Sequence, residues 1–76
     1  MIASLLWYNK NDKIGQMIDS HTGKIYFITV QTELENAIYL IPGALADIEL
    51  APYAFSANIV KASFNYGARR SEIKSA

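Results

Sequence analysis

Residues 5–30 have the sequence LLWYNKNDKIGQMIDSHTGKIYFITV, in which three short apolar segments are separated by turn residues. Segments rich in β-branched and aromatic residues are typical of strands, and clusters of Asn, Asp, Ser and Gly are typical of turns. The pattern predicts a three-stranded antiparallel meander. Its strands are expected at residues 2–8, 13–19 and 24–30. Gly23, in the second turn, is free to adopt the positive φ that a tight hairpin often requires.

The second half of the chain is expected to supply two more strands. Residues 42–43 are Pro-Gly, a strong break, and apolar and acidic residues then alternate over 44–50 as in a half-buried strand. A fifth strand is expected from residue 55 to about 64. Between the third strand and this break, residues 32–37 are predicted to form one or two helical turns, with a threonine cap and Glu35 at the capping-box position. Five short strands with a longer connection after the third predict an all-β, five-stranded antiparallel Greek-key barrel of the oligonucleotide-binding kind.

Length and composition limit the class of protein. A chain of 76 residues is one small domain, and 51% hydrophobic with 18% charged residues is too apolar for a disordered chain. We expect the barrel over residues 1–66 and a mobile basic tail over 67–76. No apolar run reaches the roughly 18 residues that span a bilayer, and no basic segment precedes the first apolar one. Because no apolar run is long enough, we expect no membrane binding. Because there is no cysteine for a disulfide, we expect a cytoplasmic protein.

Charge is distributed unevenly, although the formal net charge is +0. Residues 1–30 carry +1, residues 31–50 carry −4 and residues 51–76 carry +3. A strongly basic chain would have indicated nucleic-acid binding directly, but this balance does not. We interpret the acidic residues of the middle segment as a solvated flank. They are Glu33, Glu35, Asp47 and Glu49.

Catalysis finds little support in the sequence. His21 lies beside Asp19 and Ser20, but a base and a nucleophile adjacent in sequence rarely meet the geometry of a catalytic triad. Asp19 and His21 alone are too few ligands for a metal, and none of the glycines forms a phosphate-binding loop. We therefore expect a protein that is not an enzyme, with no cofactor and no small-molecule substrate.

The first two predicted strands resemble the signature of the cold-shock domain family. The signature begins with Trp7-Tyr8-Asn9 and continues, after a gap of three residues, with Lys13-Ile14-Gly15-Gln16-Met17. Later family motifs match 25–29, Gly43 with 46–50, and 57–59, so the resemblance covers roughly residues 3–60. It implies an oligonucleotide-binding barrel with an apolar interior. The residues expected inside are Leu5, Met17, Tyr26, Ile28, Ala46, Ile48 and Ile59.

The resemblance also implies a binding face on the outside of the sheet. The outward residues would be Leu6, Trp7, Tyr8, Ile14, Gln16, Phe27 and Thr29. Several depart from the family, in which the positions of Ile14 and Gln16 are usually aromatic, that of Thr29 is usually histidine and that of Leu6 is usually lysine. Three aromatic rings remain for stacking.

These residues predict non-catalytic binding of single-stranded DNA or RNA with little sequence specificity, because rings stack on bases of any kind and cations follow the phosphates. The expected site residues are Trp7, Tyr8, Lys10, Lys13, Gln16, Lys24, Phe27 and Thr29. The alternative is a protein-interaction or homodimerisation module whose contacts are outward aliphatics such as Leu6, Ile14 and Ile25. Aromatic residues late in the chain are expected to pack rather than stack. They are Tyr53, Phe64 and Tyr66.

Overall fold

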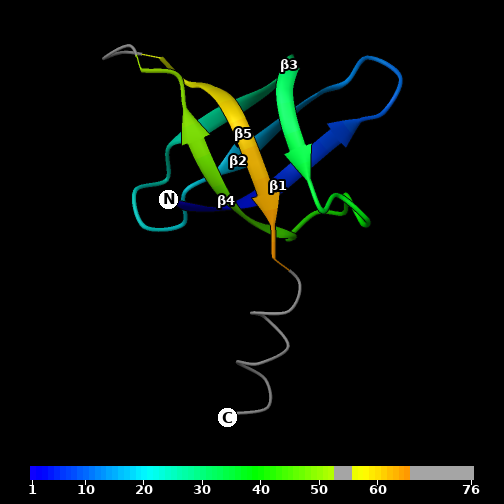
Figure 1. Ribbon diagram of the computed structural model, residues 1–76. Helices are drawn as coiled ribbons and strands as arrows, with labels where there is room; N and C mark the ends of the chain where they lie inside the picture. The colour runs from blue at the N-terminus through cyan, green and yellow to red at the C-terminus, as the bar shows by residue number, and fades with distance from the viewer. Residues whose placement is uncertain (53–55, 66–76) are drawn as a thin grey trace, which may run out of the picture.

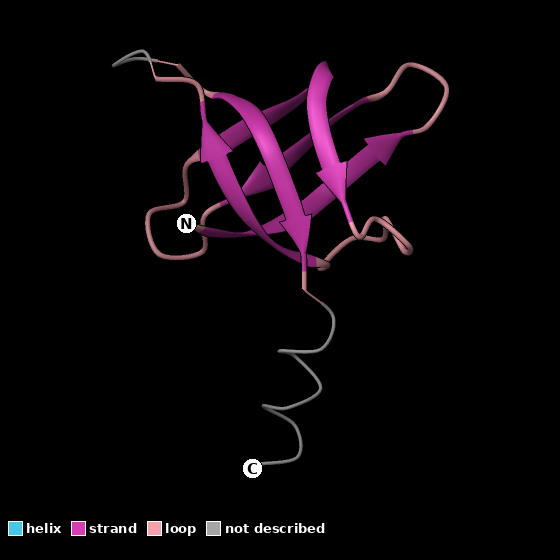
Figure 2. Cartoon of the chain, viewed as in Figure 1, coloured by secondary structure: helices cyan, strands magenta, loops and turns pink. Residues whose placement is uncertain are grey.

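The computed structural model describes residues 1–52 and 56–65, which form strands, turns and loops without a helix (Figure 2). The strands are β1 (Ile2–Asn9), β2 (Ile14–Ile18), β3 (Ile25–Glu35), β4 (Leu45–Leu50) and β5 (Asn58–Phe64). They close into a five-stranded barrel, so the predicted all-β barrel is confirmed. The expected tail and the aromatic residues Tyr53 and Tyr66 lie outside the described residues. Nothing in the described chain forms a helix of the length and apolar character needed to cross a membrane.

The strand order around the barrel is β1-β2-β3-β5-β4, which is consistent with an oligonucleotide-binding barrel (Figure 1). Four neighbouring pairs are antiparallel, but β3 and β5 run parallel. The predicted antiparallel arrangement is therefore confirmed in part, with β3–β5 as the exception. The reason is geometric: strands in a closed ring of five cannot alternate in direction all the way round, so one neighbouring pair must be parallel.

The barrel interior contains the residues that the sequence placed there. All seven expected inward residues are at most 7% exposed, and Phe64 joins them at 3%. Leu5, Met17, Ile28 and Ile59 are the largest fully buried side chains. Each contributes roughly 1.5–3 kcal/mol through burial of its apolar surface. This core holds the outer faces of β1, β2 and β3 in a fixed arrangement.

The predicted helical turns over 32–37 were wrong, because β3 continues as far as Glu35. The Thr32 hydroxyl does not cap a helix but donates a hydrogen bond to the backbone carbonyl of Ile59. Leu34 packs against the core, and Glu33–Glu35 pair with β5. Long-range pairing with β5 thus outweighs the local helical signal. Asn36 then ends the strand in a left-handed conformation, with φ at 55°.

A β-bulge at Leu6 determines which side chains of β1 face outward. Leu5 is opposite Met17 on β2 and Trp7 is opposite Gln16, so Leu6 is an extra residue on β1. A bulge of this kind presents two consecutive side chains to the same side. Leu6 and Trp7 are accordingly both exposed, at 37% and 42%.

The turn between β2 and β3 depends on the Asp19 carboxylate. Asp19 Oδ1 accepts the backbone N–H of His21 at 2.9 Å, and Gly23 closes the turn with a φ of 74°, the predicted positive value. The contact between Asp19 and His21 therefore involves the backbone of His21. The hydrogen bond from His21, with further ones from Thr22, holds the pKa of Asp19 below its ordinary value.

Because the fold lowers the pKa of Asp19, the charged carboxylate stabilises the protein above the ordinary aspartate pKa of about 3.9. That stability is lost as the pH falls through the lower pKa of the folded state. Asp19→Asn should therefore lower the urea midpoint at pH 7 and flatten its decline between about pH 5 and 2. Urea denaturation followed by Trp7 fluorescence measures both. Asp12→Asn, in an exposed turn, is the control, and an unchanged acid dependence in Asp19→Asn contradicts the prediction.

Candidate functional site

Two exposed aromatic rings lie in one row across the outer face of the barrel. Trp7 on β1 is paired with Gln16 on β2, Gln16 with Phe27 on β3, and Phe27 with Asn58 on β5. We call these four residues the aromatic row. Trp7 and Phe27 are 42% and 41% exposed. The Trp7 indole N–H donates to Gln16 Oε1 at 3.1 Å, which fixes the edge of the ring against β2.

Tyr8 does not belong to this row. It is opposite Gly15 on β2, which is opposite the buried Ile28, and it is half-buried against the core. The expectation that Tyr8 faces outward with the other two rings was therefore wrong. The bulge at Leu6 is the cause, because it moves Trp7 to the outer face and turns the next residue inward.

The surface around the two exposed rings carries no charge on β1, on β2 or on the first part of β3. β1 and β2 contain no charged residue, and β3 contains none before Glu33. Five exposed aliphatic side chains lie on the same strands. They are Ile2, Leu6, Ile14, Ile25 and Val30, at 53%, 37%, 40%, 36% and 68% exposure. The face is therefore apolar and aromatic, with amide and hydroxyl groups between the apolar side chains.

The three predicted lysines stand at both ends of this face and do not gather. Lys10 and Lys13 are exposed in the β1–β2 turn, and Lys24 is exposed in the β2–β3 turn at the opposite end of β2 (Figure 1). Asn9 shapes the first turn, since its Oδ1 accepts two backbone N–H groups. Lys13 closes this turn in the left-handed region, with φ at 57°. The lysines thus flank the aromatic row along the strand direction.

The acidic residues lie side by side on the second half of β3 and on β4, with β5 between them, and form the expected acidic flank. Lys61 on β5 lies between Glu33 and Glu49 in the strand register, and its Nζ is 3.3 Å from Glu35 Oε2. The Ser63 hydroxyl donates to Glu35 Oε1 at 2.8 Å. This hydrogen bond and Lys61 lower the pKa of Glu35, and Glu35 in turn raises the pKa of Lys61. Lys61 is therefore neutralised locally, and the acidic residues outnumber it.

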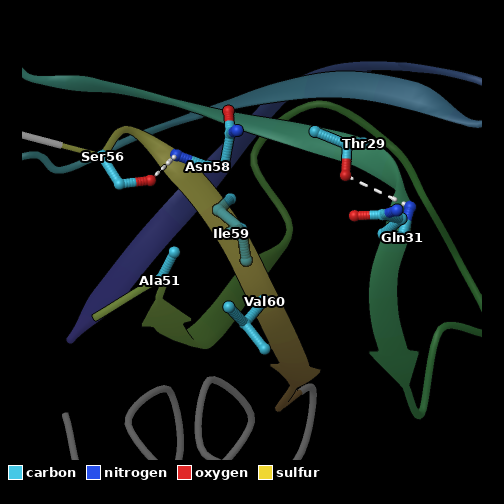
Figure 3. A pocket seen from close by; sticks show the side chains of 7 residues that line it. All are labelled: Thr29, Gln31, Ala51, Ser56, Asn58, Ile59 and Val60. Carbon is cyan, nitrogen blue, oxygen red and sulfur yellow. Dashed lines mark hydrogen bonds between the residues drawn. The ribbon is translucent and has the colours of Figure 1, made fainter. Parts of the chain in front are cut away.

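Thr29, the last predicted site residue, lies where β3 leaves β5. The ladder runs from Ile28–Ile59 to Glu33–Lys61, so β3 has four residues where β5 has only Val60. Hydrogen bonds among the threonines of this segment hold the kink, including Thr29 N–H to Thr32 Oγ1 at 2.9 Å. The strands separate here and leave a pocket of about 290 Å³ (Figure 3). Its lining residues are Thr29, Gln31, Ala51, Ser56, Asn58, Ile59 and Val60.

The sequence pattern did not indicate Gln31 or Asn58 as functional residues. Asn58 was predicted only to be part of the last strand, and Gln31 lies in a segment that was predicted to lead into helical turns. The pocket exists because the β3–β5 ladder is interrupted, which no local signal reveals.

No protein-family model, no curated protein and no solved structure matches this chain. A proposal for the function is therefore based on three features of the structure: the aromatic row, the flanking lysines and the acidic residues around Lys61.

Proposed function

We propose that this protein binds single-stranded DNA or RNA without catalysis, as a divergent cold-shock-like barrel acting in the cytoplasm. The observation that carries the proposal is the pair of exposed rings, Trp7 and Phe27, in one row of an uncharged sheet face. Single-stranded nucleic acid is bound by such rings, because every base has an apolar face that stacks. The two rings are two strand spacings apart, about 10 Å, so each accepts a base of its own.

The expected affinity follows from the number of rings. Each stacked base contributes roughly 1–3 kcal/mol, so Trp7 and Phe27 together contribute about 2–6 kcal/mol before the cost of ordering the strand. Lys10, Lys13 and Lys24 add phosphate contacts at the two ends of the face. The acidic residues around Lys61 repel a phosphate backbone, which directs it to the aromatic row. Binding is therefore moderate and dependent on salt.

Titration with a ten-residue oligothymidine at low salt tests the proposal. Trp7 is the only tryptophan of the chain, so its fluorescence reports on the site directly. We expect the emission to be quenched on binding. Each lysine that meets a phosphate contributes about −0.7 to the slope of log K against log salt concentration.

Replacing Lys10, Lys13 and Lys24 by methionine should therefore make that slope less negative by about 2. Lys61→Met is the matched control, because Lys61 lies on the acidic side beside Glu35 and should leave the slope unchanged. Unchanged Trp7 emission at high micromolar protein, or an equal effect of Lys61→Met, contradicts the proposal.

A second function is favoured by the exposed aliphatic side chains of the same face. Leu6, Ile14 and Ile25 surround the rings and form an apolar surface of the kind that marks protein interfaces. In this alternative the face binds another protein or a second copy of the chain. Such binding depends weakly on salt, and dimerisation gives a mass that increases with protein concentration.

A further inference from the structure

The pocket between β3 and β5 continues the aromatic row. Asn58 is both the last member of the row and part of the pocket lining, and Thr29 is the next outward residue of β3 after Phe27. A strand whose bases stack on Trp7 and Phe27 therefore reaches the pocket with its next base. The pocket lies where that base would arrive.

The lining of the pocket has a definite chemical character. None of the seven lining residues in the described part of the chain is charged, so these residues offer nothing to neutralise a phosphate or a carboxylate. Ala51, Ile59 and Val60 supply apolar contact, while the other four residues supply hydroxyl and carboxamide groups. A neutral, flat group with apolar faces and polar edges fits this lining.

Two carboxamides provide the polar recognition. The side chains of Gln31 and Asn58 stand on either side of the gap between β3 and β5 (Figure 3). Among residues 1–52 and 56–65, no hydrogen bond occupies either side-chain amide. The nearby hydroxyls already accept hydrogen bonds from the backbone, since Thr29 Oγ1 accepts the backbone N–H of Gln31 at 3.2 Å and Ser56 Oγ accepts that of Asn58 at 3.2 Å. Each side-chain amide therefore has a donor and an acceptor to offer.

We propose that this pocket reads one unpaired nucleobase, with adenine preferred, through the carboxamides of Asn58 and Gln31. A carboxamide pairs with adenine through two hydrogen bonds at once, donating to N7 and accepting from N6. This inference rests on the proposed function for the delivery of the base, but the pocket itself is testable with a free nucleoside. Such a pocket makes the protein bind single strands that contain adenine in preference to others.

The first test compares a ten-residue oligothymidine with the same oligomer carrying one central adenine. The wild-type protein is expected to bind the adenine-containing oligomer at least about fivefold more tightly, the lower bound for a bidentate amide contact. Asn58→Ala and Gln31→Ala should each reduce this ratio towards one. Gln31→Ala, which lies outside the aromatic row, should change the affinity for pure oligothymidine by less than about twofold. Asn58→Asp should shift the preference towards cytosine, because a carboxylate accepts from cytosine N4 but cannot donate to adenine N7. Asn11→Ala, which removes an exposed carboxamide from the β1–β2 turn, is the control and should keep the ratio.

The second test separates the pocket from the rest of the site. Side-chain amide resonances of Asn58 and Gln31 should shift in NMR spectra on addition of adenosine and much less on addition of thymidine. If oligomers bind but the adenine preference is absent or survives both alanine variants, the pocket proposal is overturned and the stacking function stands. If oligothymidine does not bind but adenosine shifts these resonances, the proposed function fails and the pocket stands. Absence of both the preference and the shifts overturns the pocket.

Discussion

Replacing both Trp7 and Phe27 by alanine is expected to weaken oligothymidine binding by at least about 30-fold. Each ring contributes roughly 1–3 kcal/mol by stacking, so the lower bound for two rings is about 2 kcal/mol. Both rings are exposed on the barrel surface, and their removal leaves the core residues in place. The change is measured by fluorescence anisotropy of a labelled oligothymidine, because the variant lacks its tryptophan.

The matched control is Ile2→Ala, which removes an exposed apolar side chain from the same strand outside the aromatic row. It should bind like the wild-type protein. Sedimentation of the same variants distinguishes the alternative function. If the double variant keeps its oligothymidine affinity but loses a concentration-dependent dimer, the face is a protein interface and stacking is excluded as its role.

Gly15→Ala is expected to cause the largest loss of stability from a single methyl group. A Cβ at Gly15 would lie 2.5 Å from the Trp7 carbonyl oxygen and 3.1 Å from Cδ1 of Tyr8. The first of these contacts involves the backbone of β1, so the strand itself must move. We expect a cost at or above the upper end of the roughly 1–3 kcal/mol typical of overpacking. A chain of 76 residues has only about 4–11 kcal/mol of stability in all.

The expected result is a fall in Tm of more than about 10 °C, measured by circular dichroism. Oligothymidine affinity should fall as well, because the displaced carbonyl belongs to Trp7. Gly23→Asn is the control: a Cβ there meets no atom within 4 Å, and asparagine tolerates a φ of 74° better than most residues. A Tm for Gly15→Ala equal to that of Gly23→Asn would show that β1 accommodates the methyl group without cost.

Much of the fold was predictable because its signals are local. The Asn-rich turn after Trp7, the hairpin at Gly23 and the alternation in β4 each follow from residues close together in the sequence. The interior was predictable for the same reason, since side chains of a strand alternate between its faces. What the sequence could not predict arises between distant segments. Pairing of Glu33–Glu35 with β5 replaces the expected helical turns, and the closed ring requires the parallel β3–β5 pair.

The same difference between local signals and pairing of distant segments applies to the candidate site. The resemblance placed Trp7, Gln16 and Phe27 on one face, and the strand register brings them into one row. Tyr8 was misplaced because strict alternation takes no account of the bulge at Leu6. Gln31 and Asn58 line the same pocket at a break in a ladder between segments 27 residues apart, for which the sequence offers no signal.

The parallel pairing of β3 and β5 has a mechanical consequence. This seam is the place where ring closure forces two strands to run the same way, and its hydrogen bonding lapses between Ile28 and Glu33. The two strands can therefore separate locally at these positions, while the five register pairs on either side keep the seam closed. Such a local widening would admit a larger heterocycle between the two carboxamides, while Trp7 and Phe27 keep their spacing because both pair with Gln16 on β2. The strands that carry the stacking rings thus stay fixed, while the neighbouring β3–β5 seam can open locally to recognise a base.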